Sequence, residues 1–343
     1  MRFIDLALHG GCSKKGPATE VRNLLSKVQK AYSGSHLELI SKNFPDCGVY
    51  SNGELLLSTV DIVLPMTLSS VDFGKITVSH VLSDLYASGG MPSFALCILG
   101  IPGGMRADSD LAVEVLTAAA QQLDAEKVAL VGGHTMTDQQ DFYLGFAAVG
   151  RAIAAKPFLQ AAAEPGDILI LTKPLGTSIA TARWKLEQAS EDDHRDVIEG
   201  MRKSNRDAAL FLANRMIHAC TDITGYGFLG HLYNILNASS VAAKIYLSKV
   251  PIYESLQDVT TPDDSSQFWH NKEYIKAHFT SSVSITPLMD SLLFDSQVSG
   301  GLVISVPPEE VSPISNGLRK AGYSVSLVGE VCAGKAGAIE LLP

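Results

Sequence analysis

The sequence predicts an α/β protein with two domains. Patterns typical of strands and helices alternate along the chain, and this alternation runs through twice, once before about Arg151 and again from Pro165. The length of 343 residues is more than twice the roughly 150 residues of an average domain. Hydrophobic residues make up 46% of the chain and occur throughout it, so each half can build a core of its own.

The first half is expected to alternate helices with strands. Val21, Leu24 and Val28 recur at helical spacing and predict an amphipathic helix. Apolar, β-rich runs bounded by turn residues predict the strands. In chain order the predicted elements are helix Thr19–Tyr32, strand Glu54–Met66, helix Phe73–Ser88, strand Phe94–Leu99, helix Asp110–Leu123, strand Val128–Val131 and strand Phe142–Val149.

The second half repeats the alternation. A polar, irregular stretch at Glu254–Ser282 is expected to be an excursion on the surface. The predicted elements are strand Asp167–Leu171, helices Thr177–Glu187 and Asp192–Met216, a helix after Gly225-Tyr226-Gly227, strand Ala243–Leu247, strand Leu302–Val306, helix Pro308–Ala321 and strand Ser324–Gly329.

Composition excludes several classes of function. A formal net charge of −9 without any basic run argues against binding to nucleic acid or to anionic lipid. No apolar stretch approaches the roughly 18 to 20 residues of a membrane span, and the N-terminus does not resemble a secretory signal. Five cysteines without a C-x-x-C pair fit a reducing compartment. We therefore expect a cytoplasmic protein.

The N-terminal segment combines glycines with a thiol and two ammonium groups. Cys12 is followed by Lys14 and Lys15, and a nearby cation favours the reactive thiolate over the thiol. Gly10 and Gly11 give the backbone freedom and argue against core packing. Cys12 is thus a candidate nucleophile, and the alternative is an inert cysteine in a frayed arm.

Four aspartates follow predicted strands or lie in apolar surroundings, namely Asp46, Asp61, Asp84 and Asp222. Magnesium binds hard oxygen ligands through one or two carboxylates together with phosphate oxygens, so scattered carboxylates suit a nucleotide site. The helix of Asp84 carries His80 on the same face and has no Lys or Glu from Ile76 to Gly90. We expect this polar face to point toward a site rather than toward solvent.

Three glycine-bearing turns could offer backbone N–H groups to phosphate: Gly132–Thr135, Gly225–Gly227 and Asp295–Gly301. Each is weak evidence when taken singly. None is a Walker loop or a G-x-G-x-x-G fingerprint, which disfavours a P-loop NTPase and a Rossmann dehydrogenase.

Taken together and in this order, the motifs resemble those of the selenophosphate synthetases (selenide, water dikinases). This family belongs to a superfamily with aminoimidazole ribonucleotide synthetase and thiamine-monophosphate kinase. The resemblance covers nearly the entire chain, and seven or so blocks in register are far more specific than any one. The blocks are Gly11–Lys15, Asp72–Gly74 with Ser83-Asp84 and Gly89-Gly90, Gly132–His134, Leu171–Gly176, Thr221–Gly225 and Asp295–Gly301.

The resemblance implies that ATP, selenide and water give selenophosphate, AMP and phosphate in a Mg²⁺-dependent reaction. It implies catalytic roles for Cys12 and Lys15, with Lys15 also contacting the nucleotide. The implied magnesium ligands are Asp46, Asp84 and Asp222. Asp61, Asp84, Gly133, His134 and Thr135 would contact the nucleotide.

The resemblance also implies an architecture of the aminoimidazole ribonucleotide synthetase type. Residues 1–16 would form a flexible glycine-rich catalytic arm, 17–155 an ATP-binding and dimerisation domain, and 156–343 a C-terminal α/β domain. The protein would be a homodimer whose N-terminal strands close a shared β-barrel.

Two alternatives remain open at this point. The first is a kinase or synthetase of the same superfamily with another acceptor, against which the Cys12–Lys15 segment argues. The second is a nucleotide-binding protein that has lost turnover. Its only hints are Pro45, where the family usually has an acid, and His80, where the family usually has asparagine.

Overall fold

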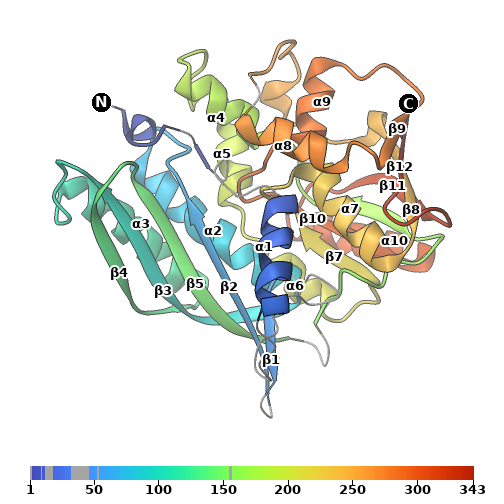
Figure 1. Ribbon diagram of the computed structural model, residues 1–343, viewed down its shortest axis with the longest axis horizontal. Coiled ribbons are helices and arrows are strands. Elements are labelled where there is room, and N and C mark those ends of the chain that lie inside the picture. The colour runs from blue at the N-terminus through green and yellow to red at the C-terminus, as the bar shows by residue number, and fades with distance from the viewer. Residues whose placement is uncertain are drawn as a thin grey trace.

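The computed structural model of the protein describes residues 2–8, 10–11, 18–31, 46–51, 54–153, 157–263 and 265–343. Two β-sheets organise these residues, and each sheet is built from one half of the chain (Figure 1). Helices pack against both sheets. The α/β prediction is therefore confirmed.

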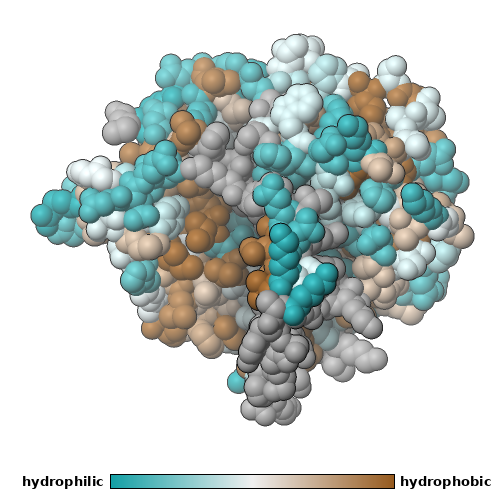
Figure 2. Space-filling view, viewed as in Figure 1, coloured by the Kyte–Doolittle hydropathy of each residue, from teal (hydrophilic) through white to brown (hydrophobic). Residues whose placement is uncertain are grey.

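The first sheet has five strands in the order β1-β2-β5-β3-β4, and only its β3–β4 pair is parallel. Helices α2 and α3 pack on one face. The other face exposes apolar residues such as Val60 and Ile62, and Figure 2 shows a brown, hydrophobic area over this sheet. Bounds are β1 Gly48–Ser51, β2 Leu55–Val63, α2 Ser70–Ala87, β3 Gly90–Pro102, α3 Asp110–Ala125, β4 Ala129–Gln139 and β5 Tyr143–Ala152.

Helix α2 lies at the centre of the molecule (Figure 1). Its N-terminus is capped by the Ser69 side chain, which accepts from the Asp72 N–H. At Gly74 a Cβ atom would lie 2.5 Å from the Val115 carbonyl oxygen, so the glycine permits close packing on α3. Helix α2 also contacts β7, α5 and α6 of the second half. It can therefore carry side chains that face both halves.

The second sheet has seven strands in the order β7-β10-β6-β11-β8-β12-β9. Its strands are β6 Ile168–Leu171, β7 Ala219–Asp222, β8 Ala242–Tyr246, β9 Phe279–Ser281, β10 Leu302–Val306, β11 Ser326–Cys332 and β12 Ile339–Leu342. The remaining helices are η1 Phe3–Leu6, α1 Ala18–Ala31, α4 Thr177–Lys185, α5 Arg195–Arg202, α6 Arg206–Leu212, α7 Gly227–Ser239, η2 Leu247–Lys249, η3 Glu254–Leu256, α8 Ser266–Ile275, α9 Pro287–Phe294 and α10 Pro308–Lys320.

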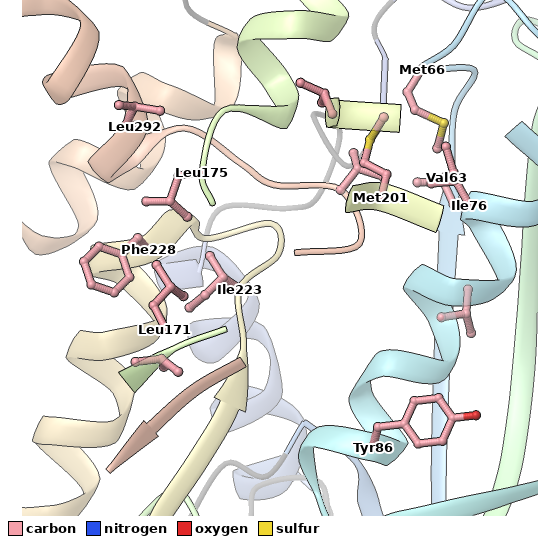
Figure 3. Close-up of a cluster of buried hydrophobic side chains, with 14 of the residues drawn as sticks. Val63, Met66, Ile76, Tyr86, Leu171, Leu175, Met201, Ile223, Phe228 and Leu292 are labelled. Carbon is pink, nitrogen blue, oxygen red and sulfur yellow. The ribbon is translucent and has the colours of Figure 1, made fainter. Parts of the chain in front are cut away.

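One continuous apolar cluster joins the two halves. Figure 3 shows residues of this cluster from both sides, with Val63, Met66 and Ile76 of the first half next to Met201 of α5. All four side chains are fully buried. The contact fixes the two sheets relative to each other, and the polar groups between them are held in a rigid frame.

The predicted turn at Gly132–Thr135 is wrong, because β4 continues through these residues from Ala129 to Gln139. At Gly133 a Cβ atom would lie 2.3 Å from the Cys97 carbonyl oxygen of β3. The glycine therefore marks a close approach between neighbouring strands, which a sequence pattern cannot distinguish from a turn.

The stretch Glu254–Ser282 is not a surface excursion, since it contains α8 and β9. Phe268 and Ile275 of α8 are buried in the core, and Asn271 donates to the carbonyls of Gly225 and Phe294. Polar residues with internal partners gave this segment a misleading surface composition.

The helix predicted over Asp192–Met216 is divided into α5 and α6 by the turn at Lys203–Asn205. Strands β1, β7 and β12 and helix α9 were missed. Among the described helices, none is both long and apolar enough to cross a bilayer.

Candidate functional site

Asp46 lies two residues before β1 and is held by side chains of the second half. The hydroxyl of Thr221 donates to both oxygens of its carboxylate at 2.9 Å, and the amide of Gln160 donates to Oδ1 at 2.6 Å. Thr221 belongs to β7, which is paired with β10. A carboxylate of the N-terminal half is thereby fixed at the end of a C-terminal strand.

Asp222 is the last residue of β7 and its side chain is fully buried. Asp46, Asp222 and His231 of α7 each offer one atom to a group in which all atoms lie within 4.8 Å of one another. In His231, Nε2 accepts from the backbone N–H groups of Thr224 and Tyr226 at 3.2 and 3.3 Å. His231 was missed by the sequence analysis, because one histidine in an apolar helix carries no motif.

Cys47, the residue after Asp46, has a buried side chain on which the charges of three carboxylates act. Burial raises the pKa of this thiol well above its usual value, and the negative charges of Asp84, Asp46 and Asp222 raise it further. A charge shifts the pKa of another group appreciably only when the two lie near each other. The charges of all three aspartates thus act at Cys47, and Asp46 and Asp222 offer atoms within 4.8 Å of each other.

Asp61 of β2 and Asp84 of α2 belong to two elements that pack on each other. The hydroxyl of Thr59 donates to Asp84 Oδ2 at 2.5 Å, and Thr59 lies two residues before Asp61 on the same face of β2. His80 lies one helical turn before Asp84, and its Nε2 atom is 3.4 Å from Asp61 Oδ2. The polar face of α2 points inward as predicted, since His80 is fully buried.

Lys173, which follows β6, is a buried cation that the sequence analysis did not single out. Its ammonium group donates to the carbonyls of Ser299 and Lys203. Burial lowers the pKa of Lys173 to about 7, although the negative charge of Asp222 acts in the opposite direction.

The burial of Lys173 predicts that the stability of the protein depends on pH. The pKa of Lys173 is about 7 in the folded protein and near 10.5 in an unfolded chain, so between these values the unfolded state binds more protons. The free energy of unfolding therefore rises with pH in this window. From pH 7 to 9, the wild type should gain up to about 3 kcal/mol relative to Lys173→Met, measured by urea unfolding in a chelator. Parallel pH profiles of the two proteins would contradict this.

Two groups of predicted residues are not part of this cluster. Gly133, His134 and Thr135 are exposed on β4 at the opposite edge of the sheet from β1. Gly133 shares a row of the sheet with Asp61 but lies three strands away, about 14 Å at normal strand spacing. Cys12 and Lys15 lie outside the described residues.

The described cysteines are all free thiols, namely Cys47, Cys97, Cys220 and Cys332. Burial is the first cause that raises the pKa of each of these thiols. A raised pKa keeps sulfur protonated near neutral pH, which makes it a poor nucleophile. None of these four has the environment of a reactive cysteine.

Both halves of the chain match known protein-family models. Residues 45–152 match the AIR synthase related protein, N-terminal domain, and residues 164–341 match the AIR synthase related protein, C-terminal domain. The chain is 35% identical to a selenide, water dikinase from Pelobacter propionicus over 83% of each chain. It is 33% identical to a selenide, water dikinase from Bdellovibrio bacteriovorus, over 94% of this chain and 93% of the relative.

Solved structures share the fold at low sequence identity. AaThiL complexed with AMPPCP and TMP superposes with a TM-score of 0.70 at 18% identity, over 96% of each chain. Hydrogenase maturation protein HypE in complex with ATP gives a TM-score of 0.64 at 16% identity, over 99% of this chain and 94% of that one. This chain belongs to the AIR synthase related proteins and, within them, to the selenide, water dikinase family.

Proposed function

We propose that this protein is a selenophosphate synthetase, which converts ATP, selenide and water into selenophosphate, AMP and phosphate. The observation that carries the proposal is the close approach of Asp46 and Asp222, with the charge of Asp84 acting on the same Cys47 thiol, in a chain of the selenide, water dikinase family. Phosphoryl transfer depends mainly on positioning and on neutralising phosphate charge, and this cluster is suited to both through bound cations.

Magnesium is the metal that fits this donor set. Asp46, Asp84 and Asp222 supply hard carboxylate oxygens, and Mg²⁺ binds such oxygens together with phosphate. His231 is not assigned as a ligand, because its Nε2 already accepts two N–H groups and the neutral ring then carries its proton on Nδ1. When bound, the ion would neutralise charge on the polyphosphate, and Asp61 would orient the nucleotide.

Cys12 is proposed to handle selenium and Lys15 to neutralise the transferred phosphate. A thiolate near a cation is suited to a soft chalcogen, and the four described cysteines are protonated structural thiols. Gly11, directly before Cys12 in sequence, exchanges two backbone hydrogen bonds with Leu64 beyond β2. A Cβ atom at Gly11 would lie 2.6 Å from Val298, so the chain enters this segment beside both halves.

The proposed boundaries are those expected from the sequence: an arm over 1–16, an N-terminal domain over 17–155 and a C-terminal domain over 156–343. The two sheets, which span 48–152 and 168–342, support this division. A cytoplasmic location is also proposed, and the four free thiols support a reducing compartment.

A homodimer through the first sheet is proposed because its open face is apolar. Val60, Ile62, Leu96 and Val131 are between 42% and 59% exposed on β2, β3 and β4. Monomers rarely expose so many neighbouring apolar side chains, and a second copy would cover them by closing a shared barrel. In such a pair, Gly133–Thr135 could contact the nucleotide of the partner.

The dimer predicts a specific effect of charge on this face. Leu96→Glu should convert a two-chain particle into a monomer in light scattering, because a buried carboxylate without a partner disfavours association. Leu186→Glu, the same change at an exposed leucine of the other half, should leave the dimer intact. A wild type that is monomeric at micromolar concentration would contradict the proposal.

The function is tested by anaerobic turnover with Mg·ATP, with and without selenide. Selenide-dependent AMP and phosphate in equal amounts is the expected result. Phosphorylation of thiamine monophosphate without selenide would instead indicate a superfamily kinase with another acceptor. Nucleotide binding without either turnover would indicate a protein that has lost catalysis.

A further inference from the structure

His80 occupies a buried position between the two halves of the site. It lies on α2, is fully buried, and touches β2 on one side and the segment Asp295–Gly301 on the other. Its Nδ1 atom accepts the backbone N–H of Ser299 at 3.0 Å. A ring nitrogen that accepts an N–H has no proton, so the neutral imidazole carries its proton on Nε2.

The Nε2 atom faces the nucleotide-site acid. It lies 3.4 Å from Asp61 Oδ2, and the side chain of Asp61 is 13% exposed. This contact is longer than an ordinary N–H···O hydrogen bond, yet an Nε2–H group at this distance would favour the orientation of the carboxylate in which Oδ2 faces the ring. Hydrogen bonds around a reaction centre are often long without ligand and shorten when ligand binds.

The donor at Ser299 is itself held rigidly. Ser299 has a φ of +48°, and its carbonyl accepts from the buried ammonium of Lys173 at 2.8 Å. The next carbonyl, of Gly300, accepts from Asn205, whose amide also donates to Ser83 of α2. A side chain that accepts from such a fixed N–H group has little freedom to rotate.

The same segment reaches the other acid of the site. A Cβ atom at Gly300 would lie 2.1 Å from the carbonyl oxygen of Ile223, the residue after Asp222. The segment Asp295–Gly301 therefore packs directly on the end of β7. His80 thus connects this end of the strand to Asp61.

We propose that His80 is a positioning residue that holds the Asp61 carboxylate through Nε2–H while the Ser299 N–H fixes its ring. The proposal deepens the proposed function, since it takes Asp61 to contact the nucleotide. It assigns a role within the site to a histidine whose burial alone would class it as a core residue. His80 acts through Asp61 and need not touch substrate.

The ring tautomer is the first test and needs no ligand. Nitrogen NMR of protein labelled with ¹⁵N-histidine, with His80 assigned by its loss in His80→Asn, should show a neutral ring protonated at Nε2. In Asp61→Asn the His80 Nε2 signal should shift while its Nδ1 signal stays. A ring protonated at Nδ1, a charged ring, or an Nε2 signal unaffected by Asp61→Asn would overturn the proposal. If His80→Asn does not fold, His80→Gln serves for the assignment.

A double-mutant cycle is the second test. In His80→Asn the amide oxygen can replace Nδ1 as acceptor for Ser299, but no group reaches Asp61. The variant should bind Mg²⁺ with a non-hydrolysable ATP analogue about tenfold more weakly, as for other groups that orient a ligand. In the Asp61→Asn background the same change should have no further effect. Additive losses, or equal affinity of His80→Asn and wild type, would contradict a role through Asp61.

The two tests of His80 can succeed or fail independently of the test of the proposed function. Both tests are made without selenide, so a protein that fails selenide-dependent turnover can still show the Nε2–H tautomer and the non-additive cycle. Conversely, turnover with an additive cycle would retain the synthetase and remove the role of His80.

Discussion

Asp222→Asn is expected to weaken binding of Mg·ATP by at least about 10- to 100-fold, the loss typical even for residues that only support a metal ligand. Asp222 is fully buried at the end of β7, where pairing with Leu302 of β10 fixes its backbone. Removing its charge leaves a divalent ion and a polyphosphate less completely neutralised. Calorimetry with a non-hydrolysable ATP analogue and magnesium measures the loss.

The stability of the Asp222→Asn protein toward urea shows whether the substitution damages the fold. Without metal, Asp222 shares a buried site with Asp46 and Asp84, and like charges destabilise one another. The metal-free Asp222→Asn protein should therefore unfold at the same or a higher urea concentration than the wild type. Asp108→Asn removes a carboxylate from an exposed pair with Arg106 and is the control for binding. Unchanged Mg·ATP affinity in Asp222→Asn would remove Asp222 from the proposed metal site.

Cys12→Ser is expected to reduce selenide-dependent AMP formation to the rate measured without selenide. A serine hydroxyl is not ionised near neutral pH and its hard oxygen is poorly suited to a soft chalcogen. Binding of Mg·ATP should survive, because the carboxylates rather than the thiol hold the nucleotide. Coupled assays for AMP and calorimetry of the same preparation separate the two effects.

The control for this change is the same substitution at another thiol. Cys332→Ser alters a half-buried cysteine of β11 and should leave both turnover and binding intact. Full selenide-dependent activity in Cys12→Ser would reduce Cys12 to a structural residue. Loss of activity in both variants would point to general thiol damage instead.

Sequence patterns predicted the helices with clear apolar periodicity. The helix of Asp84 was expected over Phe73–Ser88 and is observed as α2 over Ser70–Ala87, with its polar face inward. We expected this face to point inward because it lacks Lys and Glu, and a helix face that points to solvent normally has such long charged side chains. Where one face is distinct, sequence alone defines both an element and its orientation.

Long-range contacts explain what the patterns missed. Gly133 looked like part of a turn, although the neighbouring strand β3 is what requires the glycine. Asn271 looked like a surface residue, but its donors are satisfied by carbonyls far away in sequence. Lys173 lies in the Leu171–Gly176 block, but neither it nor His231 was expected to be buried in the site, since their partners are brought near only by the fold.

The candidate acids were predicted from their residue type, their apolar surroundings and the resemblance to the selenophosphate synthetases. Their convergence was not predictable from spacing, because Asp46 and Asp222 come from different halves of the chain. It depends on Thr221, which holds Asp46 from β7. The structure thus supplies the reason why scattered carboxylates form one cluster.

The most direct measurement is ³¹P NMR of an anaerobic reaction of the wild-type protein with Mg·ATP and ⁷⁷Se-labelled selenide. Formation of a phosphorus–selenium bond would split the product resonance, and AMP and orthophosphate should appear in equal amounts with it. This account predicts such a split resonance, absent without selenide and absent in Cys12→Ser. A reaction that consumes ATP but gives only ADP and phosphate, with no phosphorus–selenium coupling, would contradict the assignment as a selenophosphate synthetase.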